Sequence, residues 1–281
     1  MTGAAVTARR AAALFPAYAI LTVLFFVPMA LLFAVSFWTV RTFRLQPDFV
    51  LTAYGRTITS YGTLLVWTLL IAAAVSLLCT AIAFIFAYGA RFRSGKLADL
   101  FILATLITLF GGYLVKIYAW KAILSVNGVL NSVLLGVGVI DEPVTWFIFN
   151  SGAVILTLVH FLLPFAILPI YSELRNVREI TLDAARDLGA SPWTTLWKVV
   201  IPQCKSGLTA AFAICFLSAA GDYVTPMFLG GGSGVMLGQF IVLEFSTSFN
   251  WPAGAAMSFT LMGASALVIA AAWLALGRKR G

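Results

Sequence analysis

The sequence predicts an all-α integral membrane protein, organised as a single transmembrane domain over residues 1–281. The first observation behind this prediction is composition: 62% of the residues are hydrophobic and 10% are charged, whereas soluble domains carry about 25% charged residues. The second is a set of uncharged runs that each exceed the roughly 20 apolar residues that a spanning helix needs. These runs cover residues 11–38, 57–90, 143–172 and 245–277.

Six spans are expected in chain order, and each rests on an apolar stretch with few charges. The first follows Arg9 and Arg10 and is too long for the apolar core of a cleaved signal peptide, so it is expected to be retained. Lys116 interrupts the third span and Asp222 interrupts the fifth. The expected spans are residues 12–37, 62–90, 98–119, 151–172, 207–229 and 253–276.

The distribution of lysine and arginine sets the orientation of these spans. With six spans, both termini lie on one side of the membrane, and that side carries 13 of the 18 basic residues. Basic loops remain in the cytoplasm, so both termini are expected there. Residues 122–140 are also uncharged, but a seventh span would move Arg278–Arg280 to the outside. Because this stretch is rich in asparagine and glycine, it is expected to be an outer-face or re-entrant segment packed on protein.

The longest polar insert, residues 173–206, carries four acidic and five basic residues and is too charged to enter the bilayer. A short helix is expected over residues 180–188, and Gly189 can end it because glycine adopts the left-handed backbone of a helix stop. Ser191–Pro192 then offers an N-cap oxygen and a first helical residue for a second helix. Pro202 is expected to end that second helix.

Several classes of function lack support in the residues. The net charge of +8 is typical of cytoplasmic loops in a membrane protein and does not indicate nucleic-acid binding. Gly95–Lys96 lacks the spacing and the hydroxyl of a phosphate-binding loop. The glycines of residues 230–234 lack a lysine and are expected to form a flexible turn. His160 is the single histidine and is expected to be buried and hydrogen-bonded. We therefore expect no enzyme activity, cofactor or metal site in this chain.

The polar insert also resembles a known signature. Asp183-Ala184-Ala185, Gly189 and Ile201-Pro202 are similar to the EAA motif of ABC-importer permeases, with Asp183 in place of the family's leading glutamate. The resemblance implies that this insert, named the coupling loop from here on, carries a helix that docks into a groove of a separate ATPase subunit. The residues assigned to it are Asp183, Ala184, Ala185, Asp187, Gly189, Ser191, Pro192, Trp193 and Pro202.

Other segments are similar to the spermidine/putrescine permease family, B-type, over about residues 60–276. They are Gly221–Pro226, Leu229–Gly231, Asn250–Ala256, Tyr118–Lys121, Asn127–Asn131, Leu163–Phe165 and Leu168–Pro169. This resemblance implies half of the translocation pathway of a bacterial inner-membrane importer for a polyamine or similar cation. It also implies three kinds of partner: a related but non-identical permease, a solute-binding protein, and two copies of an ATPase that hold ATP and Mg. The alternative is a secondary transporter or channel without an ATPase, which leaves the EAA-like motif unexplained.

Asp222 is the charge within a predicted span that bears most on the solute. A carboxylate at the bilayer centre costs roughly 2.5–3.5 kcal/mol on insertion scales, so such a residue usually faces the interior of the bundle. For a cationic solute, Asp222 and Tyr223 offer a carboxylate and an aromatic face. An outer vestibule is expected from Tyr118, Trp120, Glu244 and Trp251.

A structural role for Asp222 is the alternative. Intramembrane carboxylates often pair with basic residues, and Lys116 and Lys121 are available on the third predicted span and just beyond it. Asp222 also stands beside Gly221 and near Pro226, where its side chain can cap a broken helix.

Overall fold

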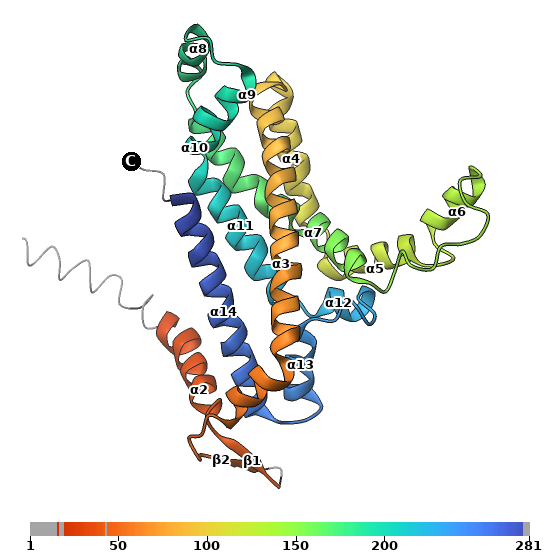
Figure 1. Cartoon of the computed structure of the whole chain (residues 1–281), viewed down its shortest axis with the longest axis vertical. Coiled ribbons are helices and arrows are strands. Elements are labelled where there is room, and N and C mark those ends of the chain that lie inside the picture. Colours follow the sequence, from red (N-terminus) through yellow and green to blue (C-terminus); the bar gives the residue numbers. More distant parts are fainter. Residues whose placement is uncertain (1–15, 17–19, 43, 278–281) are drawn as a thin grey trace, which may run out of the picture. The chain divides into compact units, whose positions relative to one another are not determined.

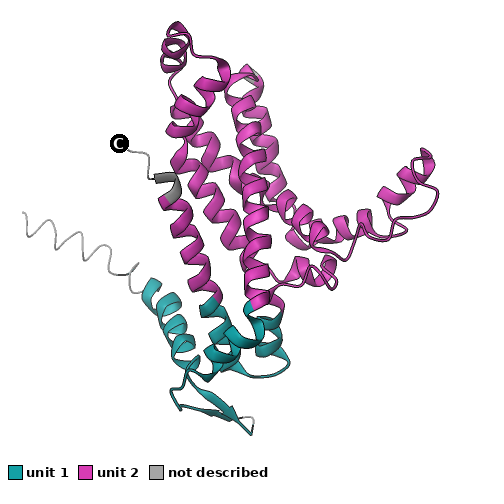
Figure 2. Cartoon of the chain, viewed as in Figure 1, with its two compact units in different colours: residues 1–62, 240–260 teal, residues 63–239, 261–281 magenta. Residues whose placement is uncertain are grey.

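The computed structural model describes residues 16, 20–42 and 44–277, most of which lie in helices (Figure 1). Contacts between residues divide the chain into two compact units (Figure 2). Unit 1 comprises residues 1–62 and 240–260, and unit 2 comprises residues 63–239 and 261–281. Three helices run from one unit into the other: α3 (Thr52–Phe92), α13 (Leu237–Ser246) and α14 (Trp251–Gly277).

Unit 1 contains a small β-hairpin in addition to helices. The π-helix η1 (Thr22–Phe26) leads into α2 (Val27–Val35), and β1 (Thr39–Arg41) then pairs antiparallel with β2 (Arg44–Gln46). Asp48 stabilises this hairpin because it accepts a hydrogen bond from Thr39 and forms an ion pair with Arg41. The all-α prediction missed the hairpin, since strands of three residues are too short to show a twofold pattern.

Aromatic contacts hold the helices of unit 1 together. The ring of Phe33 on α2 lies 5.1 Å from that of Phe37 and 5.0 Å from that of Phe259 on α14. Ser36 is buried and hydrogen-bonded with the hydroxyl of Tyr54 on α3 at 2.8 Å. Offset and edge-on ring contacts of this kind contribute about 0.5–1.5 kcal/mol each.

Unit 2 is built around α7 (Ser151–Asn176) and α11 (Lys205–Ala220), which pack along each other. Their facing side chains form one buried cluster with residues of α3, and Leu158, Ile170 and Phe216 are enclosed in it. In lipid, close packing of this kind is what holds helices together. The other helical segments of unit 2 are η2 (Gly95–Leu97), α4 (Ala98–Leu109), α5 (Tyr113–Leu124), α6 (Val129–Gly136), α8 (Glu179–Asp187), α9 (Pro192–Thr195), η3 (Leu196–Val200), α10 (Ile201–Gln203) and α12 (Val224–Leu229).

By length and composition, four helices of the described chain are able to cross a membrane, or five if one bent pair forms a single span. Three expected spans, 62–90, 151–172 and 253–276, lie within α3, α7 and α14. The expected span 12–37 lies partly outside the described residues, and its described part forms η1 and α2. The basic terminal residues used for the orientation lie outside the described residues as well.

The structure divides the expected third span, residues 98–119, between two helices. Helix α4 ends at Leu109 and α5 begins at Tyr113, with Gly111 and Gly112 in the break. Lys116 belongs to this break, because its Nζ donates a hydrogen bond to the carbonyl oxygen of Thr108 at 2.7 Å. The lysine thus adds a shorter hydrogen bond to a carbonyl at the end of α4 that the amide of Gly111 reaches at 3.3 Å.

Residues 122–140 contain the end of α5, a turn and α6. Asn131 is buried and holds this turn: its amide donates to the carbonyl of Val126 at 3.0 Å, and it exchanges two hydrogen bonds of 2.9 Å with the backbone of Val144. By length and composition alone, residues 113–136 together count among the four candidate spans. The outer-face or re-entrant interpretation of 122–140 therefore stays a prediction.

The structure also divides the expected fifth span, residues 207–229, and the break lies at Asp222, as the helix-cap alternative implies. Helix α11 ends at Ala220, and the short helix α12 begins at Val224. On the other side, α11 meets α10 at Cys204 with a bend of 70° between residues 192–203 and 205–220.

The glycine segment after α12 is packed tightly, so its expected flexibility is wrong. Gly231 has a φ of +53°, and a Cβ there would lie 2.3 Å from the carbonyl oxygen of Phe149. Two side chains of α3 fix the same segment: Trp67 donates to the carbonyl of Ser233 at 2.9 Å, and Thr68 accepts from the amide of Leu237 at 2.8 Å. Glycine is required here by backbone shape and close approach.

Gly231→Ala is expected to lower the free energy of unfolding by at least about 2 kcal/mol, because it adds a backbone penalty of about 1–2 kcal/mol and a steric clash. Thermal unfolding of the purified protein in detergent measures this change. Gly232→Ala is the matched control, since a Cβ at Gly232 meets nothing within 4 Å. Equal stability of the two variants would contradict the close packing of this segment at Gly231.

Candidate coupling loop and solute pathway

The first helix of the coupling loop ends as the sequence predicted. Helix α8 is followed by Gly189 at a φ of +76°. The amide of Gly189 donates to the carbonyl of Arg186 at 2.8 Å, and the amide of Ala190 donates to that of Ala185 at 3.0 Å. This pair of bonds is the Schellman arrangement that closes a helix with a left-handed glycine.

The second helix starts as predicted but does not end at Pro202. The Oγ of Ser191 accepts the amide of Thr194 at 3.2 Å, and Pro192 takes the first helical position. The helix then continues through the π-turn η3 and α10, which contains Pro202, to Cys204. The proline lacks an N–H and crowds the preceding turn, and a wider π-turn immediately before it accommodates the mismatch.

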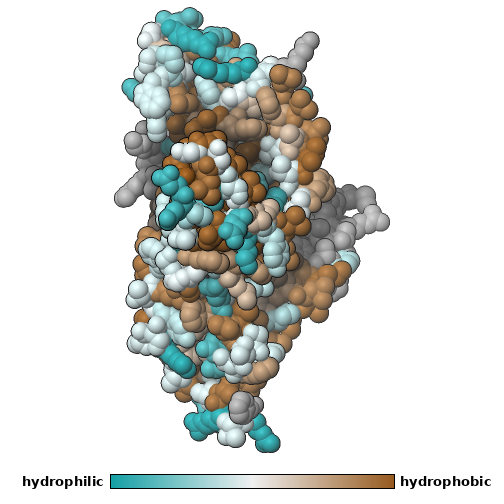
Figure 3. Space-filling model, turned by 90° about the vertical axis from the view of Figure 1, so that its right-hand side faces the viewer, coloured by the Kyte–Doolittle hydropathy of each residue, from teal (hydrophilic) through white to brown (hydrophobic). Residues whose placement is uncertain are grey.

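The outer surface of the coupling loop exposes apolar side chains. Leu188, Trp193 and Trp197 have exposed fractions of 88%, 67% and 53%, and the two indole rings contact each other edge-on at 5.7 Å. Hydrophilic residues gather at the same end of unit 2 (Figure 3). Large apolar side chains beside charges at a tip of this kind are typical of a protein-binding surface.

The acidic residue at the head of the EAA-like motif has a local partner. Asp183 Oδ1 lies 2.9 Å from Arg186 Nη1, one helical turn later. Ala184 and Asp187 are exposed and Ala185 is half-buried, whereas Leu182 points into the core of unit 2. The helix therefore turns its motif residues mostly outward and is attached by Leu182.

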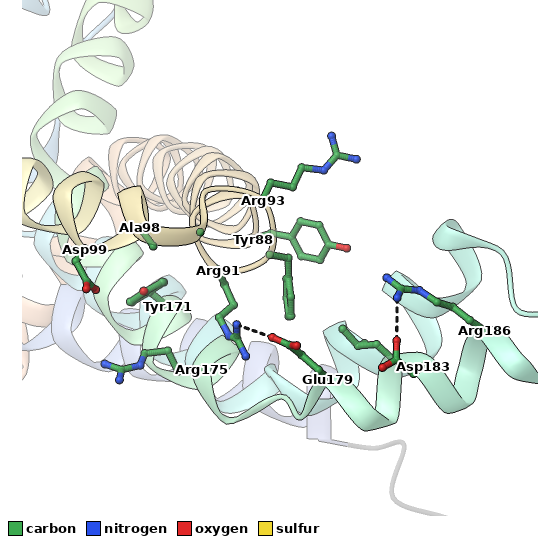
Figure 4. A pocket seen from close by; sticks show the side chains of 13 residues that line it. Tyr88, Arg91, Arg93, Ala98, Asp99, Tyr171, Arg175, Glu179, Asp183 and Arg186 are labelled. Carbon is green, nitrogen blue, oxygen red and sulfur yellow. Dashed lines mark hydrogen bonds and ion pairs between the residues drawn. The ribbon is translucent and has the colours of Figure 1, made fainter.

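A cavity of about 800 Å³ lies beside α8 (Figure 4). It is lined by residues from the end of α3, from η2 and α4, from the end of α7 and from α8. Within it, Arg91 Nη1 of α3 lies 3.1 Å from Glu179 Oε1 of α8.

The structure places Asp222 in the break between α11 and α12, where it caps α12. Its Oδ1 accepts the amide of Val224 at 3.1 Å, and its Oδ2 accepts the amide of Thr225 at 3.2 Å. The hydroxyl of Tyr113, the first residue of α5, donates to Asp222 Oδ1 at 2.5 Å and is hydrogen-bonded with Thr225 Oγ1 at 2.8 Å. One carboxylate thus joins the break in α4–α5 to the break in α11–α12.

The capping interpretation of Asp222 is therefore confirmed, and pairing with a lysine is not observed among the described residues. Lys116 Nζ lies 5.4 Å from the ring centre of Phe161, and Lys121 Nζ lies 5.4 Å from that of Phe228. Both ammonium groups thus lie over aromatic faces.

A cavity of about 260 Å³ opens beside this cluster. Asp222, Tyr223 and Ser218 supply polar atoms to its lining, and Tyr113 and Phe161, whose ring centres are 4.6 Å apart, supply aromatic faces. A carboxylate beside two aromatic rings is suited to an ammonium group, since cation–π contacts contribute about 0.5–2 kcal/mol.

The other residues expected in the pathway lie in two places. In unit 2, Tyr118 is exposed against Phe228, and Trp120 is half-buried with its ring 5.7 Å from that of His160. His160 is exposed, so its expected burial is wrong: it lies on a face of α7 that does not enter the core.

In unit 1, Glu244 is buried, and Trp251 is exposed with its ring 6.2 Å from that of Phe245. The sequence analysis missed Tyr113, although Gly111–Gly112 immediately before it signals a helix break. Among the described residues, no three His, Cys, Asp or Glu side chains are grouped as a metal site requires.

Comparison with solved structures defines the class of the fold. A bacterial ABC transporter that imports the acidic polysaccharide alginate superposes with a TM-score of 0.74 at 14% identity, covering 96% of this chain and 95% of the other. An alginate ABC transporter in complex with a pentasaccharide-bound periplasmic protein gives 0.69 at 13% identity, covering 93% and 91%. The fold is that of an ABC-transporter permease. No protein-family model matches the chain.

Relatives that share sequence with this chain define its family more narrowly than the solved structures do. The spermidine/putrescine transport system permease protein PotB of Escherichia coli (strain K12) is 34% identical over 215 residues, which are 76% of this chain and 78% of PotB. PotB of Haemophilus influenzae is 34% identical over 252 residues, 86% of this chain and 85% of PotB. The chain belongs to this family of spermidine/putrescine transport permeases, which are transport components rather than enzymes.

Tyr113→Phe is expected to lower the free energy of unfolding by about 1 kcal/mol, because it removes the hydroxyl that links the two helix breaks. Thermal unfolding in detergent measures the change. Tyr118→Phe removes a hydroxyl from the same helix at an exposed position and is expected to leave stability unchanged. A Tyr113→Phe variant as stable as wild type would show that the link is dispensable.

Proposed function

We propose that this chain is the permease subunit of an ATP-driven importer for a polyamine such as spermidine or putrescine. The observation that carries the proposal is the 33–34% identity, over most of the chain, to permeases named for transport of these two solutes. The chemistry of the 260 Å³ cavity supports it, because a carboxylate and aromatic rings line the space. A polyamine carries several ammonium groups that suit this lining.

The coupling loop is the proposed contact with the ATPase. Exposed Leu188, Trp193 and Trp197 offer an apolar surface that a groove of the partner can cover. Gly189 gives the loop its bend between α8 and α9. Two copies of the ATPase, with their ATP and Mg, supply the energy for transport.

The remaining partners and the topology complete the proposal. A related but non-identical permease supplies the other half of the pathway, and an external solute-binding protein delivers the solute. Six spans in the inner membrane, with both termini in the cytoplasm, agree with the concentration of 13 of the 18 basic residues on one side. In this arrangement the breaks at Gly111–Gly112 and at Asp222 lie within two of the spans.

ATP-dependent uptake of labelled spermidine tests the whole proposal. The chain is reconstituted in proteoliposomes with its ATPase, its second permease and its binding protein. Uptake that requires ATP and all four components supports the importer. Uptake that continues without the ATPase would support a secondary transporter or channel instead.

Asp222→Asn is expected to reduce spermidine uptake about tenfold at low solute concentration, since loss of one charge-assisted contact costs about 1.5–3 kcal/mol and 1.4 kcal/mol is a factor of ten. Asparagine keeps one oxygen that accepts the amide of Val224 and so still caps α12, while its –NH2 group cannot accept the amide of Thr225. Co-purification of the ATPase checks that the complex assembles. The control variant Tyr113→Phe keeps the carboxylate of Asp222 and is expected to take up more spermidine than Asp222→Asn does. Unchanged uptake by Asp222→Asn would show that this carboxylate does not contribute to the solute pathway.

Gly189→Val is expected to weaken substrate-stimulated ATP hydrolysis, because a β-branched residue at a φ of +76° costs about 1–2 kcal/mol and opens the helix stop. Gly189→Asn is the matched control, since asparagine tolerates the left-handed backbone. Its ATPase stimulation is expected to stay close to that of wild type. Similar activity in both variants would argue against the bend as part of the contact.

A further inference from the structure

Helix α8 contacts α9 and η3 within the coupling loop, and it has few attachments to unit 2 outside that loop. It follows α7 directly, through Val177 and Arg178, and Leu182 is its one buried side chain. A third attachment is the ion pair between Glu179, the first residue of α8, and Arg91 in the last turn of α3. Figure 4 shows this pair reaching from one wall of the 800 Å³ cavity to the other.

The positions of the two charges favour this contact. Arg91 lies at the C-terminal end of α3, where the helix dipole attracts a cation, and Glu179 lies at the N-terminal end of α8, where it attracts an anion. The Arg91 guanidinium also lies 5.1 Å from the ring centre of Phe92. Its side chain is 25% exposed, against 69% for Glu179, so the arginine is the better fixed partner.

Because of this cavity, the ion pair affects the position of α8 more than it affects the stability of the fold. An ion pair with one exposed partner adds little to the free energy of unfolding. Here, however, a cavity lies between α8 and the ends of α3 and α4. Besides the packing of Leu182 in the core of unit 2, the Arg91–Glu179 contact is the polar contact that joins α8 to α3 among the described residues.

We propose that Arg91 is a positioning residue for energy coupling, which acts through Glu179 to join the movement of α8 to that of α3. This inference rests on the proposed function, in which an ATPase moves the coupling loop. The chain connects α8 to α7, and the ion pair connects it to α3. A displacement of α8 therefore moves the adjoining ends of two helices instead of one.

A charge exchange in the complete reconstituted importer tests this inference. The readout is the number of spermidine molecules transported per ATP hydrolysed. Arg91→Glu and Glu179→Arg are each expected to lower this ratio about threefold to tenfold, a range typical of coupled contacting residues, while the ATPase still co-purifies. The double variant with exchanged charges is expected to restore the ratio to within about twofold of wild type.

Arg93→Gln is the matched control, because it removes a positive charge from the same end of α3 and the same cavity, and Arg93 forms no ion pair among the described residues. Its ratio is expected to equal that of wild type. If a charge-reversed variant fails to assemble, Arg91→Gln, Glu179→Gln and their double variant replace it. The double glutamine variant is then expected to be no worse than either single one.

Two outcomes overturn the inference: an exchanged pair no better than the single variants, or a loss in Arg93→Gln equal to that in Arg91→Gln. Failure of the proposed function looks different, because the wild-type complex itself would then show no ATP-dependent uptake. If the wild-type complex transports spermidine but the effects of the two substitutions are additive, the role of Arg91 is refuted and the proposed function is not.

Discussion

A helix break leaves backbone N–H and C=O groups without helical partners, and lipid offers them none where the break lies in a membrane. Unit 2 contains two helix breaks, and the carboxylate of Asp222 makes hydrogen bonds at both. It caps the amides that open α12 and accepts the hydroxyl of Tyr113 at the start of α5. Lys116 donates a hydrogen bond to a carbonyl at the end of α4. Because the breaks share one carboxylate, neither is independent of the other, and the small cavity at their junction depends on both.

Helix α11 connects this junction to the coupling loop. It begins at Lys205, directly after the 70° bend at Cys204, and ends at Ala220, two residues before Asp222. Along its length it packs against α7, which continues into α8. A close-packed pair of helices transmits displacement with little internal deformation. The two ends of unit 2 are thus joined by a stiff element, whereas α8 borders a cavity.

The sequence was sufficient for features that depend on local chemistry. The Gly189 stop, the Ser191 cap and the long uncharged helices follow from residue types and spacing. The sequence was insufficient where contacts between residues far apart in the chain determine the local structure. Hydropathy did not place the break after α4, because it does not register a carbonyl that Lys116 of the next helix satisfies. The Asp222 cap was one alternative among several, and Tyr113, its main partner, lies 109 positions earlier. The packing of Gly231 against Phe149 is equally remote in sequence.

The exposed leucine and tryptophans of the coupling loop have a consequence for biogenesis. Leu188, Trp193 and Trp197 are exposed in the single chain, and large exposed apolar patches favour aggregation. In the proposed importer, the cytoplasmic motor shields them. A cell that makes more permease than motor then holds orphan subunits that quality-control proteases can recognise. On this proposal, the surface that contacts the motor would also mark unassembled copies for removal, and the supply of one subunit would limit the amount of the other.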